Sequence, residues 1–267
     1  MTRLGRSQEA DRPRALGKAA AVVEAVATES KLSRIAAKVD LPVSTVHRIV
    51  QELAELGWVR ADGRRGYTLG PRLLAICAQS TGGTSLLRVA DPFLRDLRDA
   101  TGHTVHMAAR EGDAMVYLAK LDGLRAYQMR SHVGLTISMH CTAVGKCVLA
   151  ALAPAEVRAI VARTGLARHT EHTITELSRL LEDLEVVRRN GFACDDEENE
   201  AHVRCVGALI VDSHGLPAAS VSVSSLSFEV NEARFRRHAE LVVATARQVS
   251  QALGARLAEN PHPNSKR

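Results

Sequence analysis

Apolar residues recur at helical spacing over the first sixty residues, where they define three short segments. Residues 16–29 and 32–40 place apolar side chains at i, i+3 and i+4, which predicts two amphipathic helices. Pro42 interrupts the pattern, because the residue before a proline is disfavoured in the α conformation. A third helix is predicted from Ser44, a good N-cap residue, to Gly57, a good stop. Its predicted inward positions are Val46, Ile49, Val50, Leu53 and Leu56.

The opposite face of the third predicted helix is polar at its start. Its side chains can donate hydrogen bonds to phosphates or to base edges. Two helices joined by a tight turn, with a polar first turn on the second, are typical of a helix-turn-helix that binds DNA. The predicted DNA-binding residues of the two helices are Ser33, Ser44, Thr45, His47, Arg48 and Gln51.

A basic hairpin is predicted directly after these helices. Two strand-like segments, 58–61 and 67–69, flank a turn at Asp62-Gly63. Arg64 and Arg65 stand at the tip of this turn, as in a wing that lies along the DNA backbone or minor groove, and they complete the predicted DNA-binding set. The alternative is a helical hairpin used for protein contacts, with the two arginines as ordinary surface charge.

The remainder of the chain alternates between helical and strand-like patterns. A linker helix is predicted at 71–80, and the glycines of residues 81–85 predict a flexible joint. The rest predicts an α+β domain with a central antiparallel sheet. Its helices are expected at 86–102, 141–152, 154–165, 175–191 and 231–257, and its strands at 103–110, 114–121, 125–133, 204–212 and 218–225.

Composition and charge narrow the function. The chain has 267 residues, 46% of them hydrophobic, and its five cysteines form no C-x-x-C pair. No apolar run reaches the roughly 20 residues of a membrane span, and no secretory signal is visible, so we expect a cytoplasmic protein with reduced thiols and no membrane contact. Residues 1–72 carry 13 lysines and arginines against 8 acidic residues, whereas residues 73–267 carry 22 of each. This segregated positive charge favours a polyanion-binding N-terminal part.

Both halves resemble one protein family. "LSRIAAKVDLPVSTVHRIVQELAELGWVRADGRRGYTLGPRLLAI", with its "STVHR" and "YTLG", is similar to the winged helix-turn-helix of the isocitrate lyase regulator (IclR) family of bacterial transcription factors. "MHCTAVGKCVLAAL", "TEHTITELSRLLEDLEVVRRNGFACDDEENE", "RCVGALIVDSHG" and "ASVSVSS" resemble the effector-binding domain of the same family. The resemblance covers about residues 15–258 in order.

The resemblance implies a multidomain α+β protein. A winged helix-turn-helix would be joined by a linker helix to a profilin-like or GAF-like α+β effector-binding domain. The expected divisions are a basic tail (1–14), the DNA-binding domain (15–72, with the helix-turn-helix at about 32–56), a linker helix and joint (73–85), the effector-binding domain (86–258) and a C-terminal tail (259–267).

A pocket for a small carboxylate is suggested by two features of the second half. The helix predicted within "CTAVGK" offers unpaired N–H groups at its N-terminus, which favour anions. Ser222 and Ser224 project to one face of a strand, although both serines facing solvent is an equal alternative. The family resemblance implies an effector site made of Ala126, Met129, Ala143, Val144, Asp195, Cys205, Ser222 and Ser224. Two departures from the family pattern, His202 and Leu209, leave the identity of the effector open.

Other classes of function find little support. His140 and Cys141 are adjacent and point apart, so they form no nucleophile–base pair by spacing alone, and no catalytic fingerprint is present. We therefore expect no enzyme and no cofactor. We also expect no metal site, because His-x-x-His on a strand places its rings on opposite faces. The residues weighed for a metal were His103, His106, His169, His172, His202 and Cys205, and those weighed for redox sensing were Cys141 and Cys147.

The sequence thus predicts a DNA-binding transcriptional regulator of the repressor type, although it does not distinguish repression from activation. It would bind a palindromic double-stranded operator as a homodimer or homotetramer, under the control of a small carboxylate or sugar-acid effector. The alternative is a metabolite-sensing protein that acts through protein–protein contacts.

Overall fold

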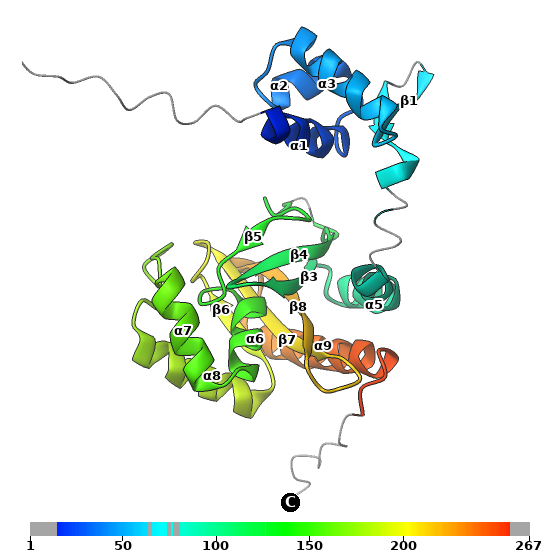
Figure 1. The fold of residues 1–267 in the computed structure, drawn as a ribbon. Helices are drawn as coiled ribbons and strands as arrows, with labels where there is room; N and C mark the ends of the chain where they lie inside the picture. The colour runs from blue at the N-terminus through cyan, green and yellow to red at the C-terminus, as the bar shows by residue number, and fades with distance from the viewer. Residues whose placement is uncertain (1–14, 64–65, 74–75, 77–80, 126, 257–267) are drawn as a thin grey trace, which may run out of the picture. The chain divides into compact units, whose positions relative to one another are not determined.

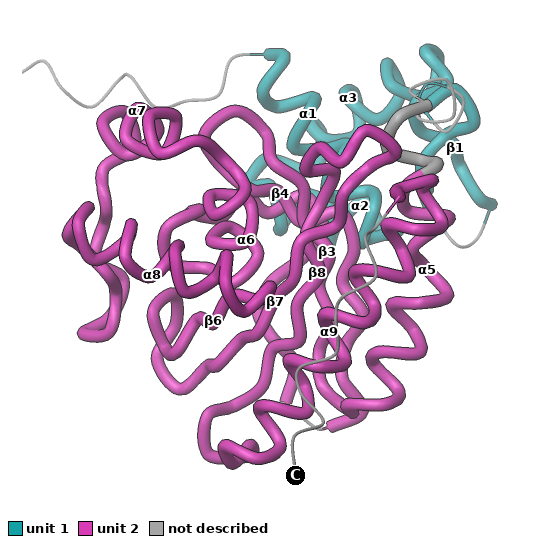
Figure 2. The backbone as a smooth tube through the Cα atoms, turned by 90° about the horizontal axis from the view of Figure 1, so that it is seen from below, with its two compact units in different colours: residues 1–84 teal, residues 85–267 magenta. Residues whose placement is uncertain are grey.

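The computed structural model describes residues 15–63, 66–73, 76, 81–125 and 127–256. The chain divides into two compact units, residues 1–84 and residues 85–267, which Figure 2 shows in different colours. The domain divisions expected from the sequence stay predictions, and each unit is described by itself.

The described part of unit 1 includes three helices followed by a small hairpin (Figure 1). The helices are α1 (Ala15–Val26), α2 (Leu32–Lys38) and α3 (Val43–Glu55), as the apolar spacing predicts. The strands β1 (Val59–Ala61) and β2 (Tyr67–Leu69) pair antiparallel and form the expected wing. The unit has its own core, made by Val22, Ala25, Val26, Ile35, Ala36, Val46, Ile49, Val50, Leu53 and Val59.

Both ends of α3 differ from the sequence-based prediction. The helix begins at Val43, and Pro42 occupies the N-cap position without a side-chain cap, so the prediction of Ser44 as cap is wrong. The ring of Pro42 holds φ near the helical value, and the helix therefore starts one residue earlier. Leu56, predicted to face inward, is 53% exposed because it lies beyond the last helical residue, Glu55.

The wing is attached to the turn between α1 and α2. The Tyr67 N–H donates to the Ser30 carbonyl oxygen at 2.8 Å. Gly66 has φ +105°, and a Cβ at this position would lie 2.2 Å from the same oxygen, so only glycine permits the close approach. Arg64 and Arg65 lie outside the described residues.

Unit 2 is built on a six-stranded antiparallel sheet with the strand order β5-β4-β3-β8-β7-β6 (Figure 1). The predicted α+β class with a central antiparallel sheet is confirmed. The strands are β3 (Thr104–Glu111), β4 (Ala114–Leu121), β5 (Thr136–Ile137), β6 (Ala193–Asp196), β7 (Val203–Val211) and β8 (Pro217–Leu226). The helices are α5 (Thr81–Thr101), α6 (Ala143–Ala151), α7 (Pro154–Thr164), α8 (Leu177–Asn190) and α9 (Glu232–Ala252), with a 3-10 turn at Ser227–Glu229.

Helices cover both faces of this sheet. The alternation of β8 directs Val221 and Val223 into a core formed with α5 and α9. The other face packs against α6, with α7 and α8 outside it, in a second core that includes Val148, Leu180 and Leu184. Ser222 and Ser224 therefore lie between the sheet and a helical layer, which excludes the alternative in which both serines face solvent.

Several segments after residue 80 depart from the prediction. The strand expected at 125–133 is absent, and the described part of this segment is irregular with only Met129 buried. A strand of a half-buried sheet buries alternate side chains, and the described residues of this segment bury only one. The joint expected at 81–85 lies instead in the first turns of α5. Glycine weakens a helix by about 1 kcal/mol per residue without preventing it. β6 was not predicted, because its sequence, Ala193–Asp196, is short and acidic.

Candidate DNA interface and ligand pocket

The polar face of α3 has the exposure that a DNA-binding surface requires. The side chains of Ser44, His47, Arg48 and Gln51 are exposed, and Thr45 is half-buried. On the opposite side, Val46 and Val50 are fully buried in the core of unit 1, which fixes the orientation of the helix. Ser33 on α2 is also exposed.

Arg48 is held along the surface of α3 by a neighbour one turn away. Its Nη1 lies 2.8 Å from Oε1 of Glu52, an i,i+4 ion pair with both side chains exposed. Such pairs contribute little to stability in water. The guanidinium can therefore exchange Glu52 for a phosphate or a guanine edge at little cost, and α3 remains folded.

The N-terminus of α6 meets the sheet where β7 carries a glycine. The Thr142 hydroxyl accepts the Gly145 N–H at 3.2 Å and caps the helix. The N–H groups of Ala143 and Val144 precede the first intrahelical hydrogen bonds, so they are free to point at a ligand. A Cβ on Gly207 would lie 3.2 Å from the Ala143 Cβ, so glycine lets the helix end approach the strand.

The other predicted effector residues lie in register on the face of the sheet that α6 covers. Asp195 on β6 pairs with Cys205 on β7, and Cys205 pairs with Ser224 on β8. One step along the same face, Gly207 pairs with Ser222. Directly paired residues project to the same side of a sheet. The fold therefore brings these residues and Ala143 together, although they are distant in sequence.

His106 belongs to the same polar cluster, and sequence reasoning considered it only as a metal ligand. Its Nε2 lies 2.7 Å from the Ser131 hydroxyl, and its Nδ1 lies 3.3 Å from the Ser224 hydroxyl. Its ring stacks on Tyr117 at 4.6 Å between centroids. Burial lowers the pKa of His106 to about 3, so the imidazole is neutral. The sequence contained one signal for this position. His106 lies between Val105 and Met107 on β3, so alternation places its side chain on the opposite face of the sheet from these two.

Asp195 is the residue of this cluster whose pKa lies near physiological pH. It is buried, and its Oδ1 accepts the N–H groups of Glu198 at 2.8 Å and Asn199 at 3.3 Å. Burial and the nearby charge of Glu198 raise the pKa of Asp195 to about 7, in spite of these hydrogen bonds. The side chain can therefore be a neutral donor or an anion at physiological pH.

The loop after β6 is fixed by a buried ammonium that the sequence-based site does not contain. Lys146 on α6 is 1% exposed, and its Nζ lies 2.6 Å from Oε1 of Glu198 and 3.0 Å from Oδ2 of Asp183. Burial alone would lower the pKa of Lys146, but the two carboxylates raise it above its usual value. The Lys146–Glu198 ion pair attaches α6 to the loop after β6. The N–H groups of this loop donate to Asp195.

Other predicted positions have less defined roles. Met129 and Ser224 line a cavity of only about 10 Å³, and Ala126 lies outside the described residues. A larger cavity of about 220 Å³, beside β5 and α7, contains none of the predicted effector residues. The side chain of His202 is 76% exposed, and its backbone has a φ of +66°. Leu209 packs against the core beneath α6.

Three buried or partly buried cysteines of unit 2 do not have the chemistry of a reactive thiol. Burial raises the pKa of Cys141 and of Cys147 to about 12 and that of Cys205 well above its usual value. Reactive thiols have lowered pKa values.

None of the helices in the described part of the chain combines the length and the apolar character that a bilayer crossing requires.

The two units define a class of protein: a winged helix-turn-helix followed by an α+β domain with a buried polar cluster. Family models described as "IclR helix-turn-helix domain" and "Bacterial transcriptional regulator IclR C-terminal" match residues 15–63 and 78–251. The chain belongs to the IclR family of bacterial transcriptional regulators, as its motifs predict. It is a regulator with a ligand-binding C-terminal domain, and not an enzyme.

Known members are similar along most of their length. The HTH-type transcriptional repressor AllR of Escherichia coli K12 is 34% identical over 226 residues, which cover 84% of this chain and 83% of AllR. The crystal structure of Thermotoga maritima IclR matches with a TM-score of 0.73 and 29% identity, covering 90% of this chain and 98% of that one. An IclR homologue of Microbacterium hydrocarbonoxydans, solved with 4-hydroxybenzoate, has the same fold, with a TM-score of 0.70, 23% identity, and coverage of 89% and 98%.

Proposed function

We propose that this regulator binds a two-fold symmetric operator in the cytoplasm as a homodimer or homotetramer, and that a small organic acid controls the binding. The observation that carries the proposal is the exposed polar face of α3 above a fully buried apolar face, in the part of the chain that holds the net positive charge. One recognition helix contacts a short half-site, so adequate specificity calls for a paired helix and a palindromic site. Similarity to the repressor AllR favours repression.

Binding to promoter DNA should weaken steeply with salt. Each phosphate that the protein neutralises releases counterions, and the slope of log affinity against log salt is about −0.9 per phosphate. A surface contacting roughly six phosphates loses on the order of a thousandfold in affinity between about 50 and 200 mM salt. Fluorescence anisotropy with fragments from the neighbourhood of the chain's own gene measures this slope.

The same experiment separates the two candidate functions. A metabolite sensor that acts through protein contacts would bind none of the fragments at low salt, with or without candidate acids. Weak binding with a flat salt dependence would equally contradict the proposal.

The effector pocket is proposed between the N-terminus of α6 and the sheet. The N–H groups of Ala143 and Val144 would bind a carboxylate, and the hydroxyls of Ser222 and Ser224 would bind its other polar groups. Neutral His106 extends this set and can either donate or accept. A carboxylate bound in the Microbacterium homologue, 4-hydroxybenzoate, is compatible with this chemistry. A ligand that binds only the native state raises the melting temperature, so thermal-shift screening of small carboxylates identifies the effector.

Affinity for the acid identified by that screen is expected to fall as pH rises through about 7. Below this pH, Asp195 is protonated and can donate to the bound carboxylate, and above it the ionised side chain repels the ligand. A single coupled proton gives a loss of about tenfold per pH unit. Calorimetry at several pH values measures the profile, and Asp195→Asn should flatten it. A profile that is the same in both proteins would show that Asp195 does not control binding.

A further inference from the structure

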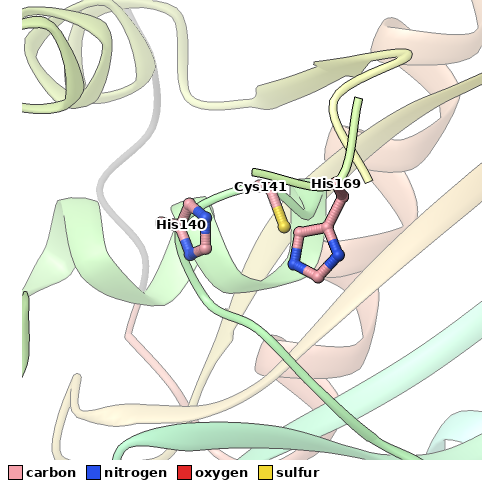
Figure 3. A group of neighbouring side chains, drawn as sticks. All are labelled: His140, Cys141 and His169. Carbon is pink, nitrogen blue, oxygen red and sulfur yellow. The ribbon is translucent and has the colours of Figure 1, made fainter. Parts of the chain in front are cut away.

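Three metal-binding side chains meet beside the start of α6. His140 and Cys141 lie on the segment that leads into this helix, and His169 lies on the connection between α7 and α8. One donor atom from each residue lies within 4.8 Å of the other two. In Figure 3 the Cys141 sulfur lies between the two imidazole rings. The fold thus gathers two nitrogen ligands and one sulfur ligand from separate segments.

His140 has the hydrogen bond of a metal-binding histidine. Its Nε2 lies 3.0 Å from the carbonyl oxygen of Ala167, which can only accept, so Nε2 carries the proton. Nδ1 then presents a lone pair. Metal-bound histidines usually donate their second ring nitrogen to a carbonyl or carboxylate in this way, which fixes the tautomer and the ring orientation. Burial lowers the pKa of His140, which keeps the imidazole in the neutral form that a metal requires.

Two carboxyl groups and the Lys146 ammonium lie near the thiol of Cys141. The thiol is fully buried, and its one weak hydrogen bond runs to Oδ1 of Asn199 at 3.7 Å. Burial raises the pKa of Cys141, and the nearby carboxyl groups of Asp195 and Glu198 raise it further. The two carboxyl groups disfavour a bare thiolate. A bound dication would neutralise the negative charge of the thiolate.

We propose that His140, Cys141 and His169 form a Zn²⁺ site with two imidazole ligands, one thiolate and a fourth position open to water or a small ligand. Mixed nitrogen and sulfur ligands suit this borderline-soft ion. Zinc binding displaces the Cys141 proton to solvent and involves no redox change. Bond lengths of about 2.0–2.3 Å bring tetrahedral ligands to roughly 3.5 Å apart, so the donors must close by about 1 Å. The side chain of His169 is exposed and can make this adjustment.

Of these three residues, only His169 was considered as a metal ligand from the sequence. The sequence pairs His169 with His172, which is exposed, whereas the fold pairs it with two residues almost 30 positions earlier. A bound ion would attach the connection between α7 and α8 to the start of α6, beside Ala143 and Val144. The proposal goes beyond the proposed function, because it concerns ion binding and not DNA or acid binding.

Cobalt provides the direct test, with the full-length protein reduced and freed of metal by a chelator. Titration with Co²⁺ should give one ion per chain, with a thiolate-to-cobalt charge-transfer band and the visible bands of tetrahedral cobalt. Zn²⁺ should displace it, and apparent Zn²⁺ affinity should rise with pH as the thiol proton becomes easier to displace.

Three variants assign the ligands. Cys141→Ser should abolish the charge-transfer band. His169→Ala, at an exposed position that should not affect folding, should lower Zn²⁺ affinity by at least about 100-fold, the upper end of the cost of losing a mere outer-shell partner. His172→Ala removes an exposed neighbouring imidazole and should bind like the wild type. Failure to bind one ion per chain, a missing thiolate band, or wild-type affinity in His169→Ala would overturn the proposal. None of these readouts uses DNA or an effector, so the proposed function stands or fails separately.

Discussion

Replacement of Glu198 by alanine is expected to lower the free energy of unfolding of unit 2 by about 3 kcal/mol, the lower end of the range for breaking a buried ion pair. The Lys146 ammonium is 1% exposed and lies 2.6 Å from the Glu198 carboxylate. Without that partner, a buried charge keeps only Asp183, whose side chain is 33% exposed. An uncompensated charge in the interior is far more costly than the pair itself.

Urea denaturation followed by circular dichroism measures this loss as a lower midpoint with an unchanged slope. Glu200→Ala is the matched control, because Glu200 is an exposed glutamate on the same loop and its removal should change stability by no more than about 0.5 kcal/mol. Adding Lys146→Met to Glu198→Ala should restore part of the stability, since the orphaned charge is then removed. Equal effects of Glu198→Ala and Glu200→Ala would show that the pair is unimportant.

Periodicity predicted the parts of the fold in which an apolar stripe decides the structure. The helices of unit 1 were predicted because apolar residues recur at every third or fourth position, and the hairpin of β7 and β8 because valines alternate with serines along β8. The same signal placed Ser222 and Ser224 on one face of β8. It could not decide between solvent and a helical layer as the neighbour of that face, because this depends on α6, which packs there through Gly207.

Polar residues of the interior have no such periodic signal. Lys146 appears in the sequence as an ordinary helix residue, and its burial depends on Glu198, 52 positions away. His106 and Tyr117 meet only because β3 and β4 pair with a bulge between Met107 and Ala108. The error at 81–85 has a different origin: local glycine propensity is weak, and the rest of α5 overrides it.

Replacement of Arg48 by alanine is expected to weaken operator binding by about 10- to 100-fold, corresponding to roughly 1–3 kcal/mol for one lost guanidinium contact. Arg48 lies on the exposed face of α3 and contacts only Glu52 among the described side chains, so the variant should fold normally. Anisotropy with the fragment bound by the wild type measures the loss. A phosphate contact would appear as a shallower salt slope by about one unit, and a base contact as relaxed sequence preference.

Two further variants show whether position or charge is responsible. Arg179→Ala removes an arginine that is also exposed, from α8 in unit 2, so it changes the net charge by the same amount and should leave operator affinity unchanged. Glu52→Ala releases the Arg48 guanidinium and removes a negative charge that repels phosphate, so binding should be equal or tighter. If Arg179→Ala weakens binding as much as Arg48→Ala, general attraction between protein and DNA explains the affinity and α3 is not the recognition helix. If only Arg48→Ala weakens it, the polar face of α3 contacts the operator.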